Sequence, residues 1–140
     1  MKIAIVASEF NEHVMTPFLE ACVDQLTSHG IELAPEDITR VPGAVEIPLI
    51  AQRYAASGRY DAVICLGAVI RGETTHYDYV CQQASYGCQK VALTHDLPII
   101  FGLLTTENDE QAFDRLGGKH GHKGRDYADT ALAMARLPRL

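Results

Sequence analysis

The chain has 140 residues, of which 18 are acidic and 12 basic, giving a formal net charge of −6 at pH 7. This length suits one domain with one core, so we expect residues 1–140 to form a single domain. The acidic balance argues against nucleic acid as the natural partner. No apolar run reaches the roughly 20 residues of a membrane span, and the chain starts without a signal peptide, so we expect a cytoplasmic protein with no membrane partner.

Apolar runs and helical spacing alternate along the chain. A short, almost continuous apolar run is typical of a strand covered on both faces, and apolar residues that recur every three or four positions predict an amphipathic helix. The predicted strands are residues 2–8, 38–41, 62–70 and 98–104. The predicted helices are residues 14–29, 47–58, 75–90, 106–116 and 127–135. Thr106 and Asp109 form the pattern of a capping box at the start of the fourth helix.

This alternation predicts parallel pairing of the strands with right-handed crossovers. The expected fold class is therefore α/β: a three-layer α/β/α sandwich around a parallel four-stranded sheet, in the flavodoxin-like arrangement. Ligands of such sheets bind at the carboxyl ends of the strands. The loops at that edge are residues 9–11, 42–46, 71–76 and 105–106.

Neither the cysteines nor the histidines predict a metal site. The four cysteines, at positions 22, 65, 81 and 88, form no CxxC pair and fall in apolar patterns, so we expect reduced core residues. His120 and His122 have no carboxylate or cysteine beside them and lie among glycines. We also find no apolar stripe beyond the core faces that would bind a partner helix.

Each loop at the ligand edge allows a structural and a functional interpretation. Phe10 and Asn11 either pack on and cap the following helix, or stack on and hydrogen-bond a heterocycle. In the turn from Gly43 through Ala44 and Val45 to Glu46, the glutamate either complements the helix dipole or accepts hydrogen bonds from a polyol. The spacing of these residues leaves both pairs of alternatives open.

The stretch from Arg71 to His76 carries the stronger functional signal. Small residues and hydroxyls at a helix N-terminus suit a phosphate, although the spacing is not that of a P-loop. His76 is either an ordinary first-turn residue or a general acid or base. Arg115 and Lys123 flank the glycine-rich bend, where two solvated cations are the default interpretation.

Five motifs together resemble the 6,7-dimethyl-8-ribityllumazine synthase family, which catalyses the penultimate step of riboflavin synthesis. They are Phe10-Asn11, residues 41–48, residues 67–77, residues 101–108 and Lys123-Gly124, in order over almost the whole chain. The resemblance implies a transferase that condenses 5-amino-6-(D-ribitylamino)uracil with 3,4-dihydroxy-2-butanone 4-phosphate without any cofactor. A flavin or lumazine storage protein on the same fold is the alternative.

The resemblance also implies a role for each site residue. Phe10 would stack on the pyrimidine, Asn11 and the turn Gly43, Ala44, Val45 and Glu46 would hold the ribityl chain, and Val69 and Ile70 would lie along the ring. Glu73, Thr74 and Thr75 would meet the phosphate, and His76 would transfer protons. Phe101, Arg115 and Lys123 would come from a neighbouring subunit, with Arg115 on the phosphate.

In the family the site lies between subunits of a homopentamer, and some pentamers assemble into larger shells; riboflavin synthase is a further partner that the resemblance implies. Three features depart from the family pattern. Val45 stands where many relatives have an aromatic residue, and His122 replaces an asparagine. The residues that precede the first strand in relatives, and lie there on an adjacent subunit, are missing, which makes a shell less expected.

Overall fold

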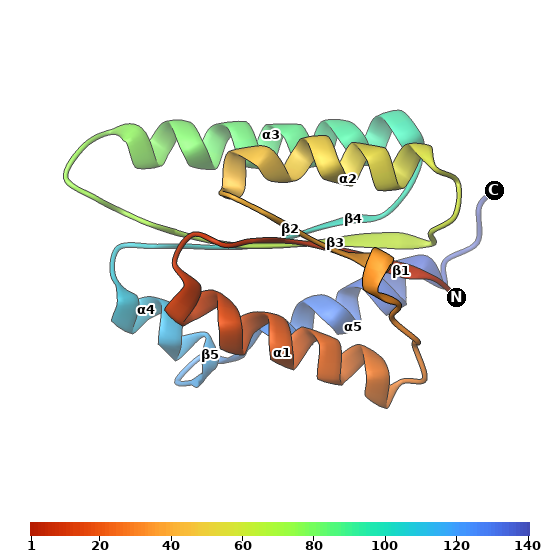
Figure 1. The fold of residues 1–140 in the computed structure, drawn as a ribbon, viewed down its shortest axis with the longest axis horizontal. Helices are drawn as coiled ribbons and strands as arrows, with labels where there is room; N and C mark the ends of the chain where they lie inside the picture. The colour runs from red at the N-terminus through yellow and green to blue at the C-terminus, as the bar shows by residue number, and fades with distance from the viewer.

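The computed structural model describes residues 1–140 and has three layers, with a sheet between two sets of helices (Figure 1). The strands of the sheet are β1 (Ile3–Ser8), β2 (Ile38–Val41), β3 (Ala62–Ile70) and β4 (Ile99–Thr106). The helices are α1 (Glu12–Ser28), α2 (Ile47–Ala56), α3 (His76–His95), α4 (Asp109–Asp114) and α5 (Lys123–Ala135). Two single turns, η1 (Pro35–Asp37) and η2 (Ala44–Glu46), and a small hairpin of β5 (Leu116–Gly118) and β6 (Gly121–His122) complete the chain.

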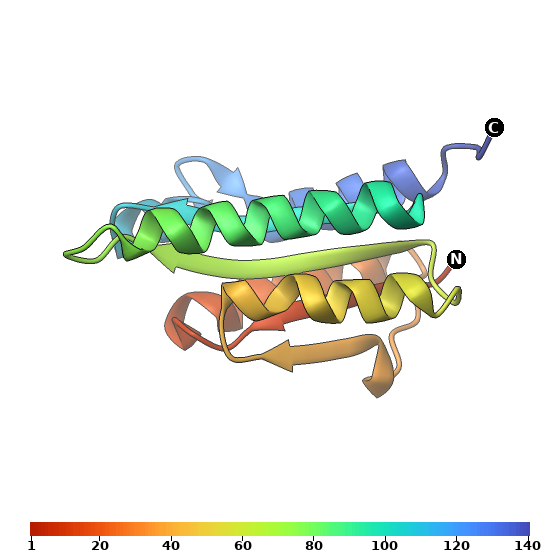
Figure 2. The same ribbon diagram turned by 90° about the horizontal axis from the view of Figure 1, so that it is seen from above.

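The four strands of the sheet are all parallel, in the order β2-β1-β3-β4. Helices α2 and α3 cover one face, and α1, α4 and α5 cover the other; Figure 2 shows the strands side by side beneath α2 and α3. The predicted flavodoxin-like sandwich is thereby confirmed. The chain leaves β1 toward β2 and later returns to β3 on the opposite side, so the topological switch point lies between β1 and β3.

Burial explains why the central strands are apolar along their whole length. Every residue of β1 is buried, and so is β3 up to Val69, because helices cover both faces. Separate apolar cores therefore form above and below the sheet. Gly87 of α3 lets that helix approach α2 closely, since a Cβ atom there would lie 2.6 Å from Pro48 Cγ. This contact fixes α3 against the segment that begins at η2.

The predicted helix boundaries differ from the structure at both ends of α4, at the start of α5 and at the end of α3, which continues past the predicted residue 90 to His95. β4 pairs with β3 as far as Ile70 opposite Thr106, so Thr106 belongs to the strand and the predicted capping box is wrong. Asn108 caps α4 instead, because its Oδ1 accepts a hydrogen bond from Gln111 N at 2.9 Å. The glycine-rich bend is the β5-β6 hairpin, and α5 begins directly after it at Lys123.

An exposed apolar stripe on α3 contradicts the expectation that no such stripe exists. Tyr79, Tyr86 and Leu93 are 62%, 70% and 74% exposed. They are spaced seven residues apart, so they share one face of the helix. The sequence pattern of α3 concealed them because its inward face, which includes the buried Ala84 and Cys88, is also apolar.

The structure contains no helix that is both long and apolar enough to cross a bilayer. It also has no group of three or more His, Cys, Asp or Glu side chains that could hold a metal ion. All four cysteines are free, and three of them are buried.

Candidate active site

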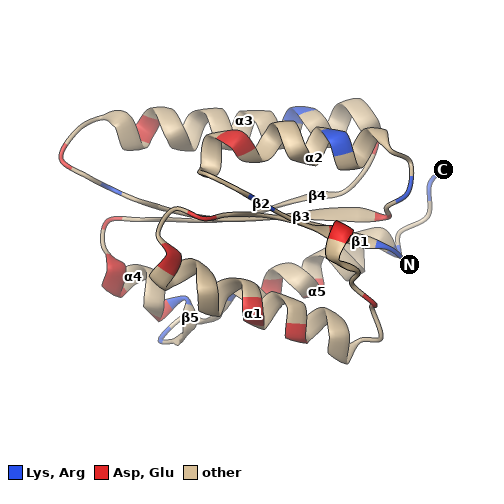
Figure 3. Cartoon of the chain, in the orientation of Figure 1, with Lys and Arg blue, Asp and Glu red and all other residues tan.

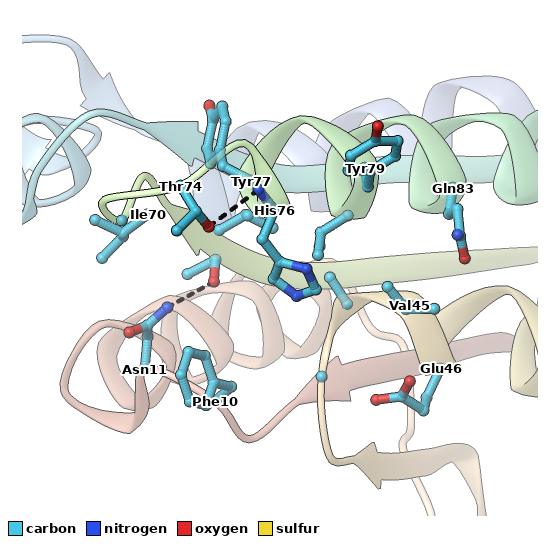
Figure 4. Close-up of a pocket in the computed structure, with 16 residues that line it drawn as sticks. Phe10, Asn11, Val45, Glu46, Ile70, Thr74, His76, Tyr77, Tyr79 and Gln83 are labelled. Atoms are coloured by element: carbon cyan, nitrogen blue, oxygen red, sulfur yellow. Dashed lines mark hydrogen bonds between the residues drawn. The ribbon is translucent and has the colours of Figure 1, made fainter.

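A cavity of about 640 Å³ opens at the carboxyl ends of β1 and β3, where the topology places the switch point (Figure 4). Ten of the residues that the sequence indicated line it: Phe10, Asn11, Gly43, Ala44, Val45, Glu46, Val69, Ile70, Thr74 and His76. They come from three loops and the end of a buried strand. The fold thus brings together residues that are as many as 66 positions apart in the chain (76 − 10).

Phe10 and Asn11 adopt neither of the structural roles that the sequence left open. Phe10 is 71% exposed, so it does not pack on the helix behind it. Asn11 occupies the N-cap position of α1, yet its side chain caps nothing. Its Nδ2 instead donates a 2.8 Å hydrogen bond to Ala68 O in β3. The aromatic ring therefore remains available to a ligand at the cavity wall.

Glu46 supplies the one carboxylate among the lining residues. Its Oε1 lies over Gly43, since a Cβ atom on that glycine would be 3.1 Å away. The glutamate is also at the start of α2, so its charge complements the helix dipole whether or not a ligand is bound. Val45 beside it is exposed, so a small apolar side chain forms this part of the cavity wall.

The turn from Arg71 to His76 joins β3 to α3 and is exposed along its length. His76 is the first residue of α3, and its backbone N–H donates to Thr74 Oγ1 at 3.3 Å. In Figure 4 the imidazole of His76 extends from the start of α3 into the space between Thr74 and Val45. A hydroxyl and a proton-transfer group thus share one cavity with the aromatic ring of Phe10.

Glu73 and Thr75 belong to the same turn but do not line the cavity. Thr75 is the N-cap residue of α3, and its hydroxyl makes no capping hydrogen bond. Both side chains are exposed at the helix N-terminus, where the N–H groups of Thr75 and Tyr77 make no hydrogen bond and are free for an anion.

Besides Tyr77, three residues of α3 that the sequence did not indicate line the cavity from one helix face: Tyr79, Val80 and Gln83. They follow His76 by three, four and seven positions, the spacing of one helix face. That spacing could have identified them once His76 was assigned to the site. Ala68, Gly72 and Tyr77 complete the lining.

No lysine or arginine lines the cavity. Arg71 is close by in sequence, but its guanidinium is already paired with two carboxylates: Nε lies 2.9 Å from Glu107 Oε2, and Nη2 lies 3.2 Å from Asp78 Oδ1. A phosphate in the cavity of this single chain would therefore meet helix N–H groups and hydroxyls without an unpaired cation.

The structure keeps three sequence-indicated residues, Phe101, Arg115 and Lys123, away from the cavity. Phe101 lies on β4, the outer strand of the sheet, and is 36% exposed. Arg115 and Lys123 flank the β5-β6 hairpin in the layer opposite α3, where Figure 3 shows basic residues near β5. They are neighbours there, since Lys123 N donates to Arg115 O at 2.7 Å.

His122, the residue next to Lys123, has a structural role at the start of α5. Its Nδ1 accepts a hydrogen bond of 3.2 Å from Gly124 N. Burial lowers the pKa of this imidazole, and the nearby Arg125 lowers it further. The neutral ring that accepts this bond is therefore favoured.

Comparison with known proteins settles the family. The family model described as 6,7-dimethyl-8-ribityllumazine synthase matches residues 1–139. The chain belongs to this family. Two relatives named 6,7-dimethyl-8-ribityllumazine synthase, from Coxiella burnetii strains CbuG_Q212 and RSA 493, are 56% identical to it over 136 residues. A third of the same name, from strain Dugway 5J108-111, is 54% identical. Each alignment covers 97% of this chain and 90% of the relative.

This membership agrees with the resemblance that the five sequence motifs carry. Lumazine synthases are transferases of riboflavin biosynthesis, and a flavodoxin-like sandwich with a cavity at its switch point is consistent with that family. Ten of the sequence-indicated residues are in the cavity and five are outside it.

Proposed function

We propose that the chain carries out its lumazine synthase reaction in this cavity, condensing 5-amino-6-(D-ribitylamino)uracil with 3,4-dihydroxy-2-butanone 4-phosphate. One observation carries the proposal: an exposed aromatic ring, Phe10, shares a cavity with a hydroxyl and an imidazole, those of Thr74 and His76. The first suits a planar heterocycle, and the other two suit a phosphorylated substrate that must exchange protons.

The pyrimidine substrate fits the wall formed by the first two loops. Its ring would stack on Phe10, and Val69 and Ile70 would line its edge. The ribityl chain would extend toward the turn that ends at Glu46, whose carboxylate can accept hydrogen bonds from the sugar hydroxyls. Asn11 would add its amide oxygen, because its Nδ2 is already bonded to Ala68.

The phosphorylated substrate fits the opposite wall. Thr74 and the N-terminus of α3 offer a hydroxyl and free N–H groups to the phosphate, with Glu73 and Thr75 exposed on the same turn. The carbonyl carbon of this substrate would then lie beside the pyrimidine amine. His76 would take up and return protons as the imine forms with loss of water and the phosphate leaves.

Such a reaction requires few catalytic groups. The amine is itself the nucleophile and phosphate is a good leaving group, so the cavity has to hold the two substrates in a productive orientation and move protons. No nucleophilic side chain is required. His76, at the junction of the two walls, is the group best located for proton transfer.

We also propose that the cavity is completed by a second copy of the chain in a homopentamer. The lining residues lack a cation for the phosphate, whereas Arg115 and Lys123 are distant from the cavity of their own chain. Phe101 on the outer strand would approach the neighbour's cavity together with them. The exposed stripe of Tyr79, Tyr86 and Leu93 supports extensive contact between copies.

Two further expectations follow from the family. We propose that the protein works in the cytoplasm, which its free cysteines support, because thiols remain reduced there. Riboflavin synthase, which would consume the lumazine product, is the further protein partner that we propose.

The test is turnover by the purified protein. With both substrates at equal concentration, lumazine fluorescence should appear well above the spontaneous rate, and it should be proportional to protein concentration. Lumazine binding without any acceleration would instead identify a storage protein on the same fold.

A further inference from the structure

Arg71 lies at the junction of β3 and the turn that carries Thr74 and His76. Its backbone N–H donates to Thr106 O at 2.9 Å and continues the ladder between β3 and β4. Beyond this bond the backbone of the turn has no hydrogen bond to the rest of the protein until Asp78 N donates to Thr75 O at 3.0 Å. The turn would be mobile if nothing else held it.

The Arg71 side chain holds both ends of this gap. Nε donates to Glu107 Oε1 at 3.2 Å and lies 2.9 Å from Oε2, which anchors the guanidinium to the segment after β4. Nη2 donates to Asp78 Oδ1 at 3.2 Å, in the first turn of α3. The guanidinium also lies over the Tyr77 ring, 4.3 Å from its centroid. One side chain thereby joins the end of the sheet to the start of the helix.

The charges show that Arg71 is not itself the phosphate ligand. Two carboxylates surround one guanidinium, so the cluster of Arg71, Asp78 and Glu107 has a net charge of −1 and does not attract an anion. In Figure 4 the Tyr77 ring, on which Arg71 stacks, points away from His76. Arg71 therefore acts from behind the turn and outside the cavity.

The ion pairs are also poorly suited to stabilising the whole fold. The side chains of Arg71, Asp78 and Glu107 are 37%, 47% and 56% exposed, and exposed ion pairs contribute little to the free energy of unfolding. Their effect is local, because they restrict where the turn can lie. Small displacements of a binding group are costly to catalysis, since even ~1 Å can reduce the rate ~100-fold.

We propose that Arg71 is a positioning residue that fixes the turn of Thr74 and His76 for the phosphorylated substrate. This role rests on the proposed function of the cavity. It deepens that function by adding a residue that touches neither substrate. The geometry required is the fork of Arg71 between Glu107 and Asp78, together with its stacking on Tyr77.

The first test compares Arg71→Ala with Arg53→Ala, which removes an exposed arginine of α2 that makes no ion pair. We expect Arg71→Ala to raise the KM for the phosphorylated substrate and the Ki of inorganic phosphate about 10-fold or more. The KM for the pyrimidine and the Tm should remain near those of the parent protein. Arg71→Lys should restore little of the lost affinity for the phosphorylated substrate, because an ammonium group lacks the planar fork of a guanidinium. An unchanged KM, or equal losses for both substrates with a lower Tm, would overturn the proposal.

In the second test, electrostatics and positioning predict opposite changes in phosphate affinity. Glu107→Gln removes a negative charge near the phosphate turn, so electrostatics alone would tighten phosphate binding. Positioning requires the opposite result, weaker binding, because the substitution releases the Arg71 fork. The loss should not add to that of Arg71→Ala in the double variant. Tighter phosphate binding in Glu107→Gln would assign Arg71 a direct electrostatic role and overturn positioning.

Hydrogen exchange separates this inference from the proposed function. Arg71→Ala should speed amide exchange in the first turn of α3, where Asp78 N donates to Thr75 O and the Asp78 carboxylate would lose its arginine partner, and leave the exchange of β1 and α5 unchanged. If the parent protein turns over and exchange in this first helical turn is unaffected by the substitution, the inference fails and the function stands. If the parent protein shows no turnover at all, the proposed function fails, and the positioning role of Arg71 fails with it.

Discussion

The Asn11 amide donates a 2.8 Å hydrogen bond to the Ala68 carbonyl oxygen, and in doing so joins the loop after β1 to the end of β3. Asn11 has a φ of +64°, a left-handed conformation that is costly for most side chains but tolerated by asparagine. This pair of residues spans the switch point of the sheet. It holds the Phe10 loop at the cavity by one backbone conformation and one side-chain bond.

Two substitutions at Asn11 separate these contributions. Asn11→Gly keeps the left-handed backbone accessible and should lose only the bond to Ala68, about 1 kcal/mol of unfolding free energy. Asn11→Ala should lose about 1 kcal/mol more, because it also places a Cβ atom at positive φ. Denaturant unfolding of both variants measures the difference. Equal stability of the alanine and glycine variants would show that the left-handed backbone conformation of residue 11 does not affect the free energy of unfolding.

His76→Ala should reduce kcat by up to about 100-fold, because one side chain that transfers protons typically contributes that much or more, while water can partly replace it. Binding of the pyrimidine should change little. His95→Ala, at the other end of the same helix, is the matched control. A kcat equal to that of the parent protein would remove His76 from the mechanism.

Arg115→Ala should weaken binding of the phosphorylated substrate by ~2 kcal/mol or more, about 30-fold in KM, because only the phosphate would contact this charge. The pyrimidine should bind as before, and Arg125→Ala on the exposed face of α5 should affect neither substrate. Mixed pentamers made by co-refolding Arg115→Ala with His76→Ala should regain activity, since some interfaces would combine two intact halves. No gain on mixing would indicate that each chain completes its own cavity.

The buried carboxylate of Asp37, which precedes β2 at the end of the sheet away from the cavity, gives the stability of the fold a defined pH dependence. Asp37 is fully buried and accepts hydrogen bonds from Tyr60 Oη at 2.7 Å, Ala34 N at 2.8 Å and Lys2 Nζ at 3.1 Å. Burial alone would raise the pKa of Asp37, but the bonds from Tyr60, Ala34 and Lys2 outweigh it and lower that pKa below its ordinary value of 3.8. Burial and the same bond raise the pKa of Tyr60 to about 12.

The sign of the pH effect follows from this shift. A carboxyl whose pKa is lower in the folded than in the unfolded chain stabilises the fold above about pH 4, and the contribution is lost as pH falls through the folded pKa. Asp37→Asn should therefore cost about 1–3 kcal/mol of unfolding free energy at pH 7 and less at pH 3. Asp24→Asn, on the exposed face of α1, should cost almost nothing. A cost for Asp37→Asn that is equal at both pH values would contradict this assignment.

The fold was predictable because its strands are buried on both faces. Apolar runs such as residues 62–70 leave little choice of structure, and the predicted bounds of β1, β2 and β3 agree with the structure to within one residue. Boundaries set by tertiary contacts were harder. Thr106 has the side chain of a good cap, but the pairing of β4 with β3 makes it a strand residue.

The site was predictable in part, for a similar physical reason. Residues at strand ends, such as Asn11 and His76, are assigned to one edge by topology alone. The bond from Asn11 to Ala68 was not predictable, because it depends on a left-handed residue and on a partner 57 positions away. The exposure of Tyr79 was hidden as well, since an apolar residue on α3 is expected to face the core.

A crystal structure of the protein with the ribitylaminopyrimidine substrate and inorganic phosphate tests the central claim most directly. We expect the pyrimidine ring on Phe10, the ribityl chain near Glu46, and the phosphate at the turn of Thr74 and His76, with Arg115 of a neighbouring copy in contact with it. Either ligand bound elsewhere, with this cavity empty, would contradict the assignment of the cavity to the lumazine synthase reaction.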